Sequence, residues 1–468
     1  MKYFFKISLL FATATIFISC GGKTIPKELG LKSNNKELTE SCLVQERFTA
    51  LQKEQEEVLN AYLNLAGFAY HQQKYKESNI FFDKAINKYR YFENKGVISV
   101  SRTLSYIIAS FLNDTHLDYE GDGYEKVMMH NYKAINYLML NDKENARVEV
   151  RNSYQKQMEE REKFSREIAE YKKKDKEMIE KEKKLPRKKR RYRRSKKSIY
   201  SRLKPIFEGV SSEHMPYQNP FAYYVSALVY EENGEFDDAY LDIKQASKYY
   251  PDSRILKEKL LYYAQKVKNK NNPLKKRAEV FINFSSSPIK EQMKVPIYLN
   301  GAMQFVSFPT FKMTNSSANS VIIKDDRGAT VASSSILTDV DAIVINIFKE
   351  RVLGMVLRQV VNVGTKTVAS EAISNKLDTG NVLVGAAVGL GVSLVSAMTS
   401  KADTRTWSTL PSKIDALSFN YDKSKKYTLH LLDRRGREIS KQPLHLKTQK
   451  NLRNSYTIIS IKDNSICN

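Results

Sequence analysis

The sequence has none of the short motifs that mark the common enzyme classes. There is no HExxH or paired-cysteine pattern for zinc, no GxSxG nucleophile elbow, no Walker loop and no dinucleotide fingerprint. The six histidines are scattered, and His130, beside Tyr132, fits a satisfied core residue better than a catalytic one. Missing motifs do not exclude an enzyme, but they leave no residue to which a reaction can be assigned. We therefore predict a chain that is not an enzyme, with no catalytic, cofactor-binding or metal-binding residues.

Cysteine is also scarce: the 468 residues include only Cys20, Cys42 and Cys467. In an exported chain, Cys42 and Cys467 can form a disulfide that ties the N-terminal region to the C-terminal tail. Two free thiols near the two ends of the chain are the simpler alternative.

Acidic residues are missing from 183–204, where thirteen of 22 residues are Lys or Arg. The net charge is +25, so about half of the positive excess lies in this run. Nucleic acid would be the first partner to consider in a cytosolic protein, but the N-terminus predicts export, so we expect no nucleic acid. Anionic lipid headgroups, the phosphates of a lipopolysaccharide or an acidic protein fit better. A solvated loop without a ligand is the alternative.

The residues before this run, 155–184, are rich in Glu and Lys at helical spacing and have no sustained apolar seam. This pattern predicts an exposed helix supported by ion pairs rather than a coiled coil. Pro186 ends it. We interpret 155–205 as a charged and basic insertion between helical repeats.

The N-terminus has the pattern of a secretory signal: two lysines, an apolar run over 7–18 and a small residue before Cys20. Ser19-Cys20-Gly21 resembles the lipobox of bacterial lipoproteins. That resemblance implies removal of 1–19, a diacylglycerol thioether on Cys20 and acylation, for example by palmitate, of the new amine. Two or more acyl chains hold a protein stably on a membrane. An uncleaved anchor or a simple secreted protein is the alternative, and 20–44 reads as a polar tether.

One stretch, 223–251, has the pattern of a helical hairpin. Three- and four-residue steps place its small and aromatic residues on one face of each helix, a glycine separates the helices, and a proline follows. This pattern is typical of a tetratricopeptide (TPR) repeat. The residues expected to pack the repeat are Tyr223, Ala227, Tyr230, Gly234, Phe236, Ala239, Ala246 and Pro251.

A single hairpin cannot bury its own apolar face, so about three should stack. Weaker copies of the pattern lie around 62–85 and 134–150, although ordinary helical hairpins would also explain them. We predict a layer of TPR-like helical repeats over 45–270.

The pattern changes after residue 275, where short β-rich runs are separated by Ser, Asn, Pro and Gly. Helical periodicity returns over 337–373. Asp339 and Asp341 stand at its start, and a capping role is favoured over a metal site because no His or further acid lies at ligand spacing. The sequence predicts a smaller mixed β/α domain over 275–468, with short antiparallel strands and an apolar helical hairpin over 339–400.

The glycine-rich stretch 379–400 contains 22 residues without a charge and a GxxxG pattern. It is long enough to cross a hydrocarbon core, and its small residues suit close helix packing in a membrane. A helix buried against the preceding one is the alternative, favoured by the serines and glycines that lower the apolar drive.

Several segments together resemble an uncharacterised family of TPR-containing bacterial lipoproteins, often encoded beside lipoproteins thought to activate penicillin-binding proteins. The resemblance covers roughly 50–150 and 205–435. The matching signature residues include Asp339, Asp341, Asp403, Arg405, Trp407 and Pro411. A pair between Asp403 and Arg405, with Trp407 filling a seam between helix and sheet, is the structural expectation. A binding cleft is the functional alternative.

These observations predict an α+β protein of the cell envelope, an outer-membrane lipoprotein facing the periplasm or the cell surface. We expect a scaffold whose TPR-like repeats offer a concave surface to an unknown envelope protein, with a role in peptidoglycan or envelope assembly implied by the resemblance alone. The alternative is a membrane-inserting envelope or secretion component that uses 379–400.

Overall fold

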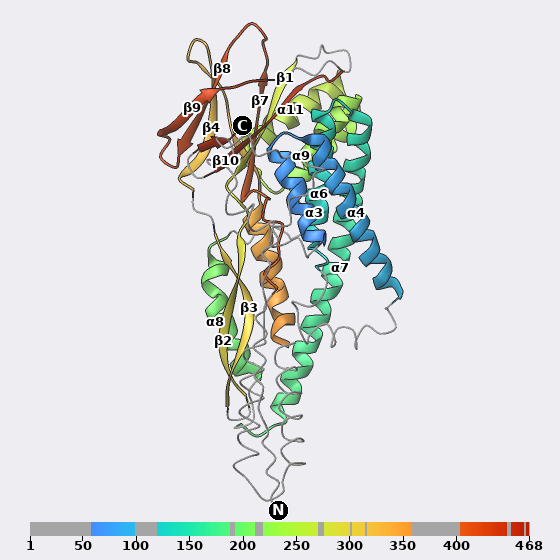
Figure 1. Ribbon diagram of the computed structural model, residues 1–468, viewed down its shortest axis with the longest axis vertical. Helices are drawn as coiled ribbons and strands as arrows, with labels where there is room; N and C mark the ends of the chain where they lie inside the picture. The colour runs from blue at the N-terminus through green and yellow to red at the C-terminus, as the bar shows by residue number, and fades with distance from the viewer. Residues whose placement is uncertain are drawn as a thin grey trace, which may run out of the picture.

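The structure, a computed structural model, has an elongated shape with a wide head and a narrower arm (Figure 1). The arm consists of residues 169–183 of α7, helix α8, the ribbon β2–β3 and a helix over 340–357; the other elements form the head. The structure describes residues 58–98, 119–187, 192–210, 219–269, 276–299, 302–313, 316–357, 403–446, 451–462 and 465–467.

Three antiparallel helical hairpins and a further helix form one layer of the head. The pairs are α3 (Val58–His71) with α4 (Tyr75–Ile98), α6 (Gly123–Met139) with α7 (Lys143–Lys183), and α9 (Pro220–Asn233) with α10 (Phe236–Ala246), followed by α11 (Arg254–Lys268). Each hairpin turns at a residue with positive φ: Gln73 (59°), Asn141 (65°) and Gly234 (83°). The left-handed conformation stops each first helix and lets the second fold back.

The second layer is a five-stranded mixed sheet in the order β11-β10-β1-β7-β6. Its strands are β1 (Arg277–Phe284), β6 (Ser335–Asp339), β7 (Lys413–Asn420), β10 (Ser455–Lys462) and β11 (Ser465–Cys467), and only the β1–β10 pairing is parallel among its described pairings. The third layer is a four-stranded antiparallel sheet in the order β5-β4-β8-β9, formed by β4 (Ala318–Asp325), β5 (Thr330–Ser333), β8 (Tyr427–Asp433) and β9 (Glu438–Pro443).

Strand β1 contributes side chains to the apolar cores on both faces of its sheet. Successive side chains of a strand point to opposite faces of its sheet. Val280 and Ile282 therefore join the apolar core between the two sheets, whereas Phe281 belongs to the core with the helices. Because both faces are covered, seven of the eight residues of β1 are buried.

The arm is organised around a long two-stranded ribbon, β2 (Ile289–Leu299) with β3 (Ala302–Lys312). Helix α8 (Tyr192–Glu208) and the 340–357 helix lie along it (Figure 1). Ile199 and Leu203 of α8, Phe308 of β3, and Phe348 and Val352 of the 340–357 helix form one buried cluster. The arm therefore has its own small apolar core.

The predicted α+β class is confirmed, with helices and both mixed and antiparallel sheets. The alternative of a solvated loop within the basic run does not hold for 192–208, which form the amphipathic helix α8 with a packed apolar face. Helix α10 ends at Ala246, and Pro251 is exposed in the turn beyond it. The predictions for Cys20, Cys42 and 379–400 lie outside the described residues, so the disulfide to Cys467 stays a prediction. Within the described ranges, no helix is long and apolar enough to cross a membrane.

Candidate functional site

The helices α3, α6 and α9 form one face of the hairpin layer, here called the first-helix face. It is covered by the five-stranded sheet and by the segment 403–412, here called the junction loop. Trp407 of this loop is fully buried, and its ring centroid lies 5.8 Å from that of Tyr132 of α6. Phe221 of α9 meets Phe281 of β1 edge-on, with ring centroids 6.0 Å apart. This face of the helical hairpins is therefore occupied by the chain itself.

Helix α3 binds the backbone of the junction loop through one side chain. Asn64 Oδ1 accepts hydrogen bonds from Thr409 N (3.2 Å) and Ser408 Oγ (2.9 Å), and its Nδ2 donates to the carbonyl of Thr406 (3.3 Å). A Cβ atom on Gly67, one turn further along α3, would lie 2.0 Å from Thr409 Oγ1. The loop approaches so closely because position 67 has no side chain.

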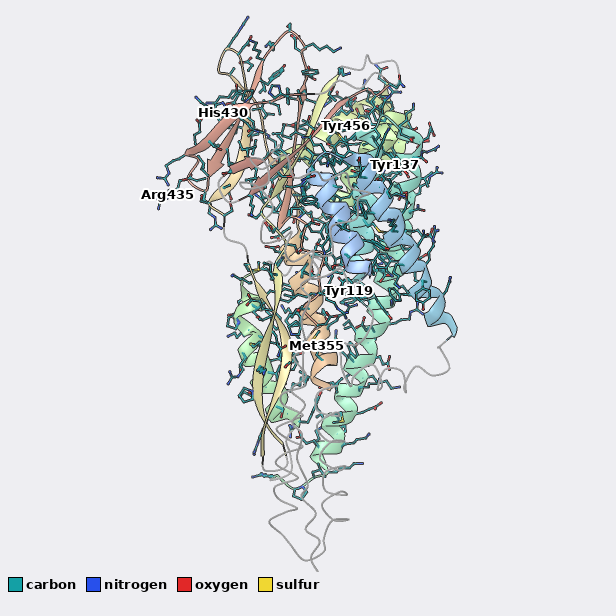
Figure 2. All side chains as sticks on the ribbon, viewed as in Figure 1. Tyr119, Tyr137, Met355, His430, Arg435 and Tyr456 are labelled. Carbon is teal, nitrogen blue, oxygen red and sulfur yellow. The ribbon has the colours of Figure 1, made fainter. Side chains whose placement is uncertain are left out.

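The predicted pairing of Asp403 with Arg405 is present. Arg405 Nε lies 2.8 Å from Asp403 Oδ1, and the guanidinium stacks over the Tyr119 ring at 5.5 Å. Trp407 Nε1 donates to Thr409 Oγ1 at 2.7 Å. Tyr119 lies where the head meets the arm (Figure 2). The contacts of Asp403, Arg405 and Trp407 are structural connections between helix and sheet.

A buried carboxylate at the start of α6, that of Glu125, accepts a hydrogen bond from the junction loop. Glu125 Oε1 accepts from Trp407 N at 3.0 Å, and Tyr119 OH donates to the same carboxylate at 2.7 Å. Asp122 N donates to Glu125 Oε2 at 2.9 Å, which satisfies the helix start. Burial, and then the negative charge of Asp122, raises the pKa of Glu125 to about 7.

Asp122 in turn connects the head to the arm. Its carboxylate contacts Lys290 of β2 at 3.3 Å and Arg351 of the 340–357 helix at 2.6 Å. Arg351 also reaches Glu167 of α7 at 3.1 Å. Burial alone would raise the pKa of Asp122, but the two cations outweigh it and lower this pKa to about 2.

The acidic pair Asp339 and Asp341 stands at the start of the 340–357 helix. Asp339 Oδ1 accepts from Ala342 N at 2.8 Å, as expected of a capping residue. Asp341 is buried, and burial followed by the charge of Asp339 raises its pKa to about 8. Among the described residues no group of His, Cys, Asp or Glu could hold a metal ion.

The expected repeat-packing residues divide into two groups. Ala227, Ala239 and Ala246 are fully buried, and Gly234 ends α9 in the left-handed conformation. The partly buried aromatic residues Tyr223, Tyr230 and Phe236 pack at the edge of the core. Pro411, at the end of the junction loop, is buried.

A buried charge network, not foreseen from the sequence, joins α9, α11 and β1. Lys259 has no exposed surface and lies 2.6 Å from Glu279 Oε1 and 3.4 Å from Glu231 Oε2. Tyr263 OH donates to Glu231 at 2.6 Å, and Tyr224 OH donates to Glu279 at 2.9 Å. The sequence signal for this network was Glu279, the one acid within the apolar run of β1. A charge buried in a strand requires a partner of opposite charge.

His130 belongs to a similar structural network. Its Nδ1 lies 2.7 Å from Glu149 Oε2 of α7, and Lys133 reaches Glu149 (2.8 Å) and Asp83 of α4 (2.6 Å). The partners of His130 and Lys133 in this network belong to the neighbouring helices α4 and α7.

The outer side of the hairpin layer carries an open groove between α7, α9 and α10, here called the hairpin groove, with a cavity volume of about 460 Å³. The exposed apolar residues Tyr154, Met158 and Leu241 line it, with exposed fractions of 53, 49 and 58%. Its remaining lining residues are Gln157, Arg161, Tyr223, Asp242, Lys244, Gln245 and Lys248. Burial raises the pKa of Asp242 to about 7.

Comparisons with known proteins add no relative: a scan against protein-family models, a search of curated proteins and a search of solved structures each find no match.

Proposed function

We propose that the chain is a lipid-anchored scaffold of a bacterial cell envelope that binds a protein partner in the hairpin groove. The anchor in this proposal is Cys20, and a role in peptidoglycan or envelope assembly follows from the resemblance described above. The TPR character of the hairpins is part of the same proposal and has the three left-handed turns and the buried alanines as its support.

The observation that carries the proposal is the contrast between the two sides of the hairpin layer. The first-helix face is filled by the sheet, whereas the hairpin groove leaves three large apolar side chains in solvent. Aromatic and Arg side chains contribute most of the energy in typical protein interfaces. Tyr154, Tyr223 and Arg161 supply both kinds in one groove.

The charge of the groove indicates the chemistry of the partner. Arg161, Lys244 and Lys248 face one acid, Asp242, whose raised pKa keeps it largely neutral below about pH 7. A segment with apolar side chains and carboxylates would cover the exposed apolar surface and pair with these cations. We therefore propose an acidic, partly apolar segment of an envelope protein as the occupant.

Photocrosslinking in intact cells tests this proposal. A photoreactive residue replaces Leu241 in the groove or, as the matched control, Leu261, which is 66% exposed on α11 outside the groove. We expect a discrete protein adduct from position 241 and none from 261. Arg161→Glu with Lys244→Glu should lower the adduct yield at least about tenfold. Equal adduct yields from the two positions, or a yield from position 241 that the charge reversal leaves unchanged, would contradict the proposal.

The anchor is tested separately by metabolic labelling with an alkyne-bearing palmitate. We expect the wild-type chain to be labelled and Cys20→Ala to be unlabelled and released from membranes by carbonate. Retention of the unlabelled variant after carbonate would favour the alternative, in which 379–400 enters the bilayer.

A further inference from the structure

Helix α8 presents a row of positively charged side chains on the outer side of the arm. Its 17 residues contain six Lys or Arg and one acid, Glu208. By contrast, the last ten residues of α7, 174–183, contain four lysines and four acids, so their charges cancel. The positive excess of the described arm is therefore concentrated on α8.

The cations of α8 have two different roles. Lys196 binds Asp175 of α7 at 2.6 Å, and Arg193 binds Glu182 at 3.1 Å. Tyr192 OH also donates to Asp175, at 2.6 Å, so one end of α8 is fixed to α7. These contacts, with the buried side chains of Ile199 and Leu203, determine which side of α8 faces solvent.

Three cations remain on that solvent side: Arg194, Lys197 and Arg202 are exposed, and no acid among the described residues pairs with them. The acids nearest to this side are already engaged, since Asp175 and Glu182 hold other cations and Glu208 pairs with Lys204 at 3.3 Å.

We propose that the solvent side of α8 binds the anionic headgroups of a phospholipid bilayer. A flat anionic surface can contact several cations of one helix at once, and each Lys or Arg near such a surface strengthens partitioning about fivefold. The 340–357 helix packs in the same cluster as α8. The chain that follows it carries 379–400, the stretch whose sequence is compatible with a bilayer. The contact would orient the arm toward the membrane independently of the acyl chains.

Flotation of the full chain bearing Cys20→Ala with lipid vesicles tests this contact without the anchor. We expect binding to vesicles of phosphatidylcholine with phosphatidylglycerol, little binding to phosphatidylcholine alone, and loss of binding as salt screens the charges. Neutralising the row with Arg194→Gln, Lys197→Gln and Arg202→Gln should weaken partitioning about a hundredfold.

The matched control removes the same charge from the head with Lys423→Gln, Arg434→Gln and Arg435→Gln. Arg435 lies between β8 and β9, at the outer edge of the four-stranded sheet of the head (Figure 2). We expect this variant to bind vesicles within about twofold of the parent chain. Circular dichroism of both variants should match the parent, because all six side chains are exposed.

Three outcomes would overturn the proposal: binding of the parent chain without regard to phosphatidylglycerol, equal losses in the two triple variants, or release from vesicles by inorganic phosphate at constant ionic strength. The first result would indicate apolar insertion, the second a response to net charge, and the third a site for phosphate itself. The first outcome is measured on the parent chain alone, so it can be judged even if a triple variant folds poorly. None of these results bears on the hairpin groove, so failure here is distinguishable from failure of the proposed function.

Discussion

The head and the arm use charge in opposite ways. In the head, charged groups such as Lys259, Glu231 and Glu279 are fully buried between helices and sheet and bind one another. In the arm, each pair between α7 and α8 joins a buried or partly buried acid to a more exposed cation, and Arg194 and Lys197 face solvent with no acid paired to them among the described residues. Buried pairs specify how layers fit together, whereas exposed cations remain available to an outside surface. The comparison separates a head whose layers are joined by buried charges from an arm whose described cations face solvent.

The largest expected effect comes from breaking the buried network of the head. Lys259→Ala leaves Glu231 buried without its cation and leaves Glu279 with only the more distant Arg277, at 3.6 Å. It should therefore lower the free energy of unfolding by about 3–5 kcal/mol. Lys257→Ala is the matched control, because Lys257 lies two residues away on α11 and its pair with Asp252 is exposed. The control should cost less than about 0.5 kcal/mol in urea unfolding. Similar losses in the two variants would remove the distinction between buried and exposed charge.

A smaller loss is expected where the junction loop enters the head. Trp407→Phe removes the indole N–H that donates to Thr409 Oγ1 and leaves part of a buried volume empty. We expect a loss of about 2 kcal/mol, measured by thermal unfolding followed by circular dichroism. The double variant with Thr409→Val should lose less than the sum of the two single variants, since both polar partners are then absent. Simple additivity would mean that the two side chains act independently.

The pH dependence of stability tests the carboxyl groups at the junction. The pKa of Asp341 is raised from 3.8 to about 8, so the folded chain holds a proton that the unfolded chain releases between these values. The free energy of unfolding therefore falls as the pH rises from about 4 to 8. Asp341→Asn should flatten this fall and raise the stability above pH 8 by at least about 1.4 kcal/mol, the equivalent of one pKa unit. An unchanged slope in chemical unfolding across this range would refute the prediction.

The smallest effect is expected in the arm. Lys196→Ala removes the cation bound to the partly buried Asp175, and we expect a loss of about 1 kcal/mol, seen as faster amide hydrogen exchange in α8. Lys174→Ala removes a more exposed pair with Glu170 and should change exchange by less than about 0.5 kcal/mol. Exchange in α8 that is unaffected by Lys196→Ala would show that apolar packing alone fixes this helix.

The sequence was informative where local rules decide the structure. Helical periodicity and Gly234 predicted the α9–α10 hairpin, and the short β-rich runs after residue 275 predicted strands in the C-terminal part of the chain. The pairing of Asp403 with Arg405 was also predictable, because the two residues stand only two positions apart.

Contacts between distant segments were not predictable in this way. Nothing near β1 indicates that β10 pairs with it in parallel, or that Trp407 reaches Glu125 of α6. The covered first-helix face escaped prediction for the same reason, since a repeat pattern shows that apolar residues need a cover but not which segment supplies it. The packing of α8 in the arm also escaped prediction, because the high charge of the basic run hid the spacing of Tyr192, Ile199 and Leu203.

The place of β1 at the centre of its sheet has a consequence for how the chain is made. Ala278 pairs with Ser455 on one side and with Phe419 on the other, so both neighbours are synthesised long after β1 itself. At about 5–20 residues per second, β10 emerges from the ribosome roughly ten to forty seconds after β1. During that interval the helices made first have no cover for their inner side chains. Until the final strands arrive, this exposed apolar surface favours aggregation, and premature termination within those strands would leave a fragment that lacks its cover.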